Sequence, residues 1–227
     1  MRFVNTLAAL SFLAMPAMAE DSPPILSVTG EGQVQAAPDM ATVTLGVTND
    51  AESAKAALDA NNAAVAAVFA QLAAAGIDAR DIQTSGLTLG PRFDYPAGGG
   101  NPTPNGYTAA NMVTVQVRML DKVGGVLDAV VQQGANTLNG ISFGIQDPVP
   151  TTDEARKAAV ADAQRKAELY AAAAGVKLGK IRSISENGGM MPMPMAAASY
   201  EKAGAVPIAA GQMAVGASVS IVYELNE

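Results

Sequence analysis

Four methionine residues stand within six positions near the C-terminal end of the sequence, at Met190, Met191, Met193 and Met195. Thioether sulfur is a soft ligand that suits Cu(I), and this spacing could supply three sulfurs to one ion. Methionine is also oxidised to the sulfoxide, so the same residues could form a sacrificial oxidisable patch. The simplest interpretation is a variable loop, held extended by Pro192 and Pro194. The chain has no His, which disfavours Cu(II) and zinc here.

A second pattern with known chemistry is the S-x-x-K formed by Ser199 and Lys202. In penicillin-binding enzymes such a pattern contains the nucleophilic serine, but it acts together with partner motifs that this chain lacks. The sequence contains neither Cys nor His, which excludes Ser–His–Asp and Cys–His catalysis. We therefore attribute the pattern to chance and predict a protein that is not an enzyme. No catalytic, cofactor-binding or metal-binding residue is assigned, and no cofactor is expected.

The composition narrows the class of partner. The 227 residues have a net charge of −7, which is unfavourable for binding nucleic acid or anionic lipid. Alanine is abundant and aromatic residues are only 4% of the chain, so the core should rely on closely approaching helices and β-branched strands. After the N-terminus no segment is apolar enough to predict a membrane span.

The N-terminus has the features of a secretory signal peptide. Arg2 is followed by an apolar run from Leu7 to Met15, and Ala17-Met18-Ala19 matches an A-x-A cleavage pattern. The run is far shorter than the roughly 20 residues that span a bilayer. We therefore predict residues 1–19 to be a cleaved signal peptide, with cleavage between Ala19 and Glu20. The mature chain is expected to be a soluble periplasmic protein that folds without disulfide bonds.

Alternating apolar and polar residues predict most of the strands. The period of two is clearest at 40–48, 112–119 and 214–225, and extended segments are also expected at 25–29, 81–95, 141–145 and 180–186. Gly30 and Gly32 form a G-x-G that no helix follows, so we interpret it as a turn or bulge and not as a nucleotide-binding loop. Flexible loops are expected near 96–106 and 187–212.

Three helices are predicted from apolar spacing and end signals. The first covers about 50–75, with Asn49 and Glu52 as its capping pair and Asn61 interrupting its apolar face. The second follows Asp121 and ends at Gly134. Its apolar residues are Val123, Val126, Leu127 and Val130.

The third helix is expected to begin at a capping box of Thr151 and Glu154 and to end at Gly175. Alanines recur every four residues along it, at Ala155, Ala159, Ala163, Ala167 and Ala171. Such a ridge of methyl groups predicts a very close approach to a sheet or another helix. Favourable pairs of Asp153 with Lys157 and of Asp162 with Lys166 are expected on the solvent side.

These elements follow one another in the order ββαββ-αβ-αββ. Strands outnumber helices, and short turns join most neighbouring strands. This arrangement favours an α+β fold in which three main helices pack on one face of an antiparallel or mixed sheet. Because such a sheet has edges that must be protected, we also expect a homo-oligomer.

Three segments resemble the SIMPL-domain family of exported bacterial proteins, which includes periplasmic immunogenic antigens. They are GIDARDIQTSGLTLGPRFDY, GYTAANMVTVQVRMLDKVGGVLDAVVQQGANTLNGISF and DEARKAAVADAQRKAELYAAAAGVKLGKIRSISE. The resemblance covers residues 25–225 and implies a single domain over 20–227, an α+β fold and self-association. It also implies a role in envelope or oxidative-stress tolerance, without assigning catalytic residues or a protein partner. A periplasmic Cu(I)-handling protein that uses Met190–Met195 is the alternative function.

Overall fold

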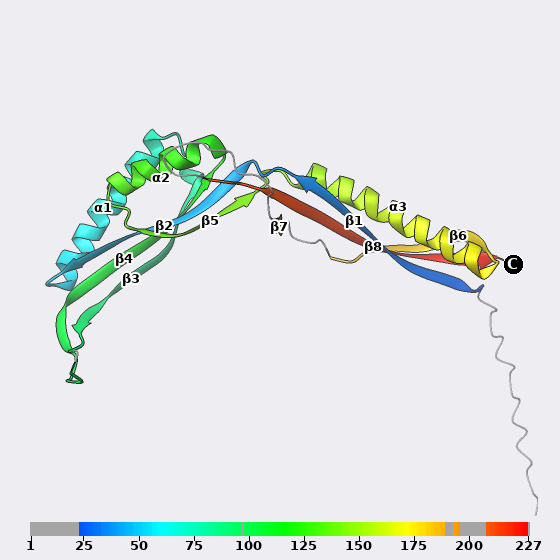
Figure 1. Cartoon of the computed structure of the whole chain (residues 1–227). Helices are drawn as coiled ribbons and strands as arrows, with labels where there is room; N and C mark the ends of the chain where they lie inside the picture. The colour runs from blue at the N-terminus through cyan, green and yellow to red at the C-terminus, as the bar shows by residue number, and fades with distance from the viewer. Residues whose placement is uncertain (1–22, 97, 189–192, 196–207, 227) are drawn as a thin grey trace, which may run out of the picture.

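The fold class expected from the sequence is confirmed. A computed structural model of the chain describes residues 23–96, 98–188, 193–195 and 208–226. Its elements follow the predicted order, with one short additional strand before the last (Figure 1). All strand pairs are antiparallel. The strands belong to two sheets, whereas the sequence analysis expected one.

Both sheets contain four strands among the residues described. One sheet has the order β3 (Ile82–Asp94), β4 (Thr103–Val117), β2 (Met40–Ala51) and β5 (Thr137–Gly144). The other has the order β1 (Ile25–Ala36), β8 (Gln212–Asn226) and β6 (Lys177–Glu186), with β7 (Met193–Met195) also paired to β8. We call them the β2–β5 sheet and the β1–β8 sheet. In Figure 1 they lie at the two ends of an elongated molecule.

Helices cover one face of each sheet. The β2–β5 sheet carries α1 (Ala54–Ala74) and α2 (Val123–Gln132), and the β1–β8 sheet carries α3 (Val149–Ala174) (Figure 1). Two short 3-10 helices, η1 (Ala79–Asp81) and η2 (Leu120–Lys122), precede β3 and α2. No helix within the described ranges is both long enough and apolar enough to cross a membrane.

The core of the β2–β5 sheet is built from valine and leucine. On β2 and β4 the odd-numbered residues face the helices, as the period of two predicts. From α2 all four predicted apolar residues, Val123, Val126, Leu127 and Val130, are buried. The buried face of α1 consists of Ala57, Asn61, Val65, Val68 and Leu72.

The core of the β1–β8 sheet confirms the predicted alanine ridge. Ala155, Ala159, Ala163 and Ala167 of α3 are completely buried. The interpretation of Gly30 and Gly32 as a turn or bulge is wrong, because both lie inside β1. A Cβ atom added to either glycine would lie 2.0 Å from a carbonyl oxygen of α3. The glycines therefore let the helix backbone approach the strand backbone directly.

The predicted helix caps are displaced by a few residues. Ser53, and not Asn49, is the N-cap of α1, and its hydroxyl accepts a hydrogen bond from the backbone N–H of Ala56. The capping box of Thr151 and Glu154 is also wrong, because α3 begins at Val149. A side-chain cap is only one of several ways to satisfy the first turn, so a cap pattern locates a helix start loosely.

The charged pairs predicted on α3 are only partly observed. Asp162 contacts Lys166 with an N···O distance of 2.7 Å, as predicted. Lys157 instead pairs with Glu154, and Asp153 pairs with Arg156. Both observed pairs have a spacing of three residues, which places side chains on the same helix face as well as a spacing of four does.

The two predicted loops overlap strands. The stretch 96–106 contains the start of β4 at Thr103, and the stretch 187–212 contains β7. The glycines predicted to end the second and third helices both have a positive φ, which favours glycine, with 107° at Gly134 and 72° at Gly175. The flexibility of the loops and the single-domain organisation of 20–227 stay predictions.

Candidate functional site

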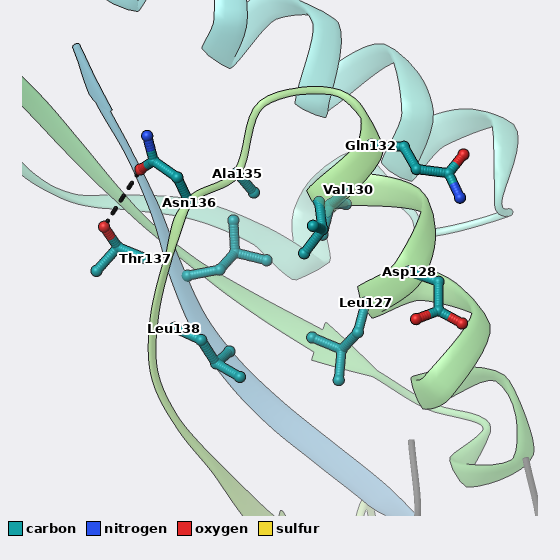
Figure 2. Close-up of a pocket in the computed structure, with 10 residues that line it drawn as sticks. Leu127, Asp128, Val130, Gln132, Ala135, Asn136, Thr137 and Leu138 are labelled. Carbon is teal, nitrogen blue, oxygen red and sulfur yellow. Dashed lines mark hydrogen bonds between the residues drawn. The ribbon is translucent and has the colours of Figure 1, made fainter. Parts of the chain in front are cut away.

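A cavity of about 500 Å³ lies at the side of the β2–β5 sheet, between α2 and β5. Buried Leu45 of β2 lines it, together with Leu127 and Val130 of α2. Leu138 of β5 is opposite Leu45 in the sheet and closes the other side. Figure 2 shows the Leu127, Val130 and Leu138 side chains converging on this space. The volume is in the range of pockets that bind small molecules.

The turn from α2 into β5 shapes one wall of this cavity. Gly134 allows the turn with a φ of 107°, and the Asn136 backbone N–H donates to the Gly46 carbonyl at 3.0 Å. The Asn136 side chain then bonds both backbone groups of Thr48: its Oδ1 accepts at 2.9 Å and its Nδ2 donates at 2.7 Å. Asn136 thereby continues the β2–β5 ladder with its side chain and fixes the start of β5.

The rim of the cavity combines exposed apolar side chains with a single charge. Val131 and Leu138 are 63% and 56% exposed, although Val130, which precedes Val131, and Leu45, the partner of Leu138 across the sheet, are buried. Asp128 is the only charged residue in the lining, and its carboxylate has no hydrogen bond or ion pair within the described ranges. The site therefore offers an apolar surface and one unpaired negative charge.

A buried amide cross-links the sheet beneath α1. The completely buried Asn61 donates from Nδ2 to the Val47 carbonyl of β2 at 2.7 Å and to the Ala109 carbonyl of β4 at 3.1 Å. Because both neighbours are acceptors, the orientation of this amide is determined by its hydrogen bonds. Asn61 is thus part of the buried face that it was thought to interrupt, and it ties the helix to two strands at once.

Two buried amide oxygens in this region have no hydrogen-bond donor among the residues described. They are Oδ1 of Asn61 and Oδ1 of Asn111, and Asn111 is only 8% exposed. Asn111 faces the helices from β4, opposite Leu87 of the edge strand β3. A buried acceptor without a partner costs roughly 1–3 kcal/mol, so these amides weaken the core locally.

Ion pairs fasten the loops around the β2–β5 sheet. Arg118 forms a two-pronged pair with Asp81, with both N···O distances at 2.7 Å. The hydrogen bonds from Arg118 hold the pKa of Asp81 below its usual value. Asp50 accepts from the Thr108 hydroxyl and from Arg92, and its pKa is lowered mainly by the Thr108 bond. These carboxylates stay charged near neutral pH, so they suit structural roles better than proton transfer.

The residues that the sequence analysis singled out for chemistry fall mostly outside the described ranges. This holds for Met190 and Met191 and for both residues of the S-x-x-K, Ser199 and Lys202. Met193 and Met195 lie on β7, which pairs with β8. Among the residues described, no group of three or more acidic side chains is placed to hold a metal ion.

Sequence reasoning missed the cavity altogether. Its lining comes from a helix, a turn and two strands, and no single stretch contains the pattern. One signal was present: Val131 follows Val130 directly, so both cannot face the core of an α-helix. An extra valine of this kind indicates an apolar side chain left at the surface.

Residues 26–223 match the family model SIMPL, described as a protein of unknown function (DUF541). A 26 kDa periplasmic immunogenic protein of Brucella melitensis biotype 1 is 38% identical over 98% of this chain and 95% of its own length. The protein YggE of Escherichia coli K12 is 32% identical over 98% of this chain and 93% of its own length. A match of this extent identifies the family: the chain belongs to the SIMPL family.

Proposed function

We propose that this chain is an exported, non-enzymatic protein that self-associates and acts in tolerance of envelope or oxidative stress. The observation that carries self-association is the uncovered edge of the β2–β5 sheet at β3. Leu87 and Leu89 of this strand are 57% and 45% exposed. They face the same side of the sheet as the buried residues Asn111 and Ala109, their partners on β4.

The exposure of these leucines follows from the position of α1. The helix packs over β2 and β4 and leaves β3 largely uncovered. Between the bulges near Ser85 and Arg92, the stretch Gly86–Gly90 pairs regularly with β4, and no strand lies on its other side among the described residues. An apolar edge of this length is a template for pairing with another chain, and a second copy is the partner we assign to it.

The remaining parts of the proposal rest on the sequence and the relatives. Export is supported by the N-terminal signal pattern and by the name of the Brucella relative, a periplasmic protein. The absence of Cys and His removes the usual nucleophile–base pairs, which supports a non-enzymatic role. A stress role is consistent with the methionines of the predicted mature chain, eight of the eleven in the sequence, because methionine sulfoxide can be reduced back and the side chain used again.

The test of self-association is the mass of the mature protein by light scattering at micromolar concentration. We expect an oligomer that Leu87→Lys dissociates. Leu169→Lys is the matched control, because Leu169 is 58% exposed and belongs to α3, the helix that covers the other sheet. A monomeric wild type, or an oligomer that both variants leave intact, would contradict the proposal.

Export and stress tolerance need separate experiments. N-terminal sequencing of the periplasmic form should start at Glu20. A deletion strain should be more sensitive to peroxide than its parent, and the wild-type gene should restore tolerance. Membrane-attached protein that keeps residues 1–19, or a deletion strain with normal tolerance, would count against these parts of the proposal.

Cu(I) handling is the second candidate, and the four clustered methionines favour it. The test is an anaerobic titration with Cu(I) against a chromophoric competitor. If the cluster is a Cu(I) site, replacing all four methionines by Ser should abolish Cu(I) binding. Met119→Ser is the control and should bind Cu(I) like the wild type, because Met119 is 48% exposed but lies outside the cluster. Equal copper binding by both variants would exclude the cluster. The replaced residues are Met190, Met191, Met193 and Met195.

A further inference from the structure

The second edge of the β2–β5 sheet differs from the one assigned to self-association. Among the strands described, β5 has β2 as its single neighbour, so its other side presents unpaired backbone N–H and C=O groups. The stretch Gly140–Gly144 pairs regularly with β2, from Gly140 opposite Thr44 to Gly144 opposite Met40. A strand added here would find a regular ladder of five residues.

This edge leads directly to the cavity beside α2. The register shifts by one residue between Leu138 and Gly140, and Gly140 has a φ of 144°. Leu138 lies just before this bulge and forms one side of the cavity, as Figure 2 shows. A chain that pairs with β5 and continues past the bulge would therefore reach the apolar space between Leu138 and Leu127.

The charge at the rim of the cavity determines which side chains of a bound chain are favoured there. Among the residues described, the unpaired carboxylate of Asp128 is the only charge in the lining, and the whole chain is acidic, with a net charge of −7. A cationic side chain is favoured beside this carboxylate and an anionic one is disfavoured. The exposed Val131 adds apolar surface beside the cavity.

We propose that β5 binds an extended segment of a partner protein by strand addition, with a large apolar side chain of that segment in the cavity and a basic side chain at Asp128. Backbone pairing supplies affinity in this mode, and the side-chain pocket supplies specificity. The site is separate from the β3 edge, so the protein can self-associate and bind its partner independently.

The probe is the fluorescently labelled peptide KFTVTVTFK, which has apolar and basic residues at both ends. We expect saturable binding by fluorescence anisotropy. Three control peptides should each bind at least about tenfold more weakly, corresponding to roughly 1.4 kcal/mol. KATVTVTAK lacks the large apolar side chains, EFTVTVTFE reverses the charge, and KFTPTPTFK lacks two of the backbone donors.

Two variants of the protein test where the peptide binds. Leu138→Ser should weaken binding about tenfold, since it removes much of one wall. Leu169→Ser, at a position of almost equal exposure on α3, should bind like the wild type. Hydrogen exchange gives an independent readout: the peptide should slow exchange within Gly140–Gly144. Protection of β3 instead, or equal weakening by both variants, would overturn the assignment.

The same experiment also tests two other occupants of this site, a small amphiphile and a second copy of the chain. If octylammonium displaces the peptide and KFTPTPTFK binds as well as KFTVTVTFK, the cavity takes small amphiphiles and strand addition is wrong. If the peptide lowers the light-scattering mass of the protein, β5 is an interface between copies and the partner proposal is wrong. Binding with an unchanged mass and the expected peptide ranking supports it, whatever the result at β3.

Discussion

The two sheets are covered by helices in different ways. On the β2–β5 sheet, valine and leucine side chains fill the space between strands and helices. On the β1–β8 sheet, every buried residue of α3 is alanine, and β1 has glycine at its centre. The first contact is a layer of interlocking side chains, and the second is close to a contact between backbones. One chain thus uses two solutions to the same problem of covering a sheet.

The difference predicts opposite sensitivities to mutation. A core of large side chains is damaged by removing volume, because the cavity left behind is not refilled. A contact between backbones is damaged by adding volume, because rigid main chain has no room to move aside. Urea unfolding of the purified protein measures the loss of stability in each case.

Gly30→Ala should have the largest effect. The added methyl carbon would lie 2.0 Å from the Ala159 carbonyl oxygen and 2.5 Å from the Ala163 nitrogen. Since helix backbone cannot yield locally, α3 must move away, at a cost of about 3 kcal/mol or more. Gly90→Ala is the matched control, because a Cβ atom at Gly90 of β3 meets nothing within 4 Å. Equal losses in the two variants would refute the backbone contact.

Leu72→Ala should destabilise the other sheet by about 3 kcal/mol. Leu72 of α1 is completely buried, so the substitution removes methyl groups from a filled core. Leu169→Ala, at an exposed position of α3, should change the free energy of unfolding by no more than about 0.5 kcal/mol. A Leu72 variant as stable as the wild type would mean that this core is loosely packed.

Ala163→Leu should cost about 2 kcal/mol, in the usual range for overpacking. Its side chain is flexible and can turn partly aside, so the loss should be smaller than that at Gly30. Ala158, which is exposed on the same helix, should accept Gln within about 0.5 kcal/mol. The reverse ranking would show that α3 is rotated about its axis relative to this structure.

The smallest effect concerns Asp162, which fastens α3 to β1. Its pKa is held well below the usual range, first by Lys166, then by the backbone N–H of Glu31 and by Arg165. A lowered pKa stabilises the folded state above the ordinary aspartate pKa of about 3.9, and this contribution is lost as the pH falls through the lowered pKa. Asp162→Asn should therefore be less stable than the wild type at pH 7. The difference should shrink below about pH 4, and a pH-independent difference would exclude the charge as its cause.

The order of elements was predictable because it depends on local periodicity. The alternation Val43, Leu45, Val47 specifies a half-buried strand whatever its neighbours are, and the alanine spacing specifies one face of α3. Pairing is not local. Nothing in the stretch around Pro38 shows that the strand before it and the strand after it enter different sheets, so one sheet was predicted instead of two.

Glycine and asparagine were misinterpreted for a related reason. Gly30 has the same local preferences in a turn and under a closely packed helix, and only the position of Ala159 distinguishes these cases. Asn61 looked like a break in an apolar face because its acceptors, the Val47 and Ala109 carbonyls, lie on two strands elsewhere in the chain. The cavity beside α2 could not be predicted at all, since its shape arises from the meeting of separate elements.

The spacing of the two glycines in β1 sets the position of α3 along the strand. Gly30 lies against Ala159 and Ala163, and Gly32 lies against Ala155 and Ala159. Two residues along a strand advance about 6.8 Å, and four residues along a helix advance about 6.0 Å. The two spacings therefore differ by only about 0.8 Å over one step, and the mismatch grows with each further step. A notch of this kind consequently suits a pair of glycines better than a longer row. Val28 and Val34 stand at its two ends on the same face of β1, so the closest approach of the α3 backbone is confined to the two glycines. The notch thus fixes the point along β1 at which the helix backbone comes nearest to the strand.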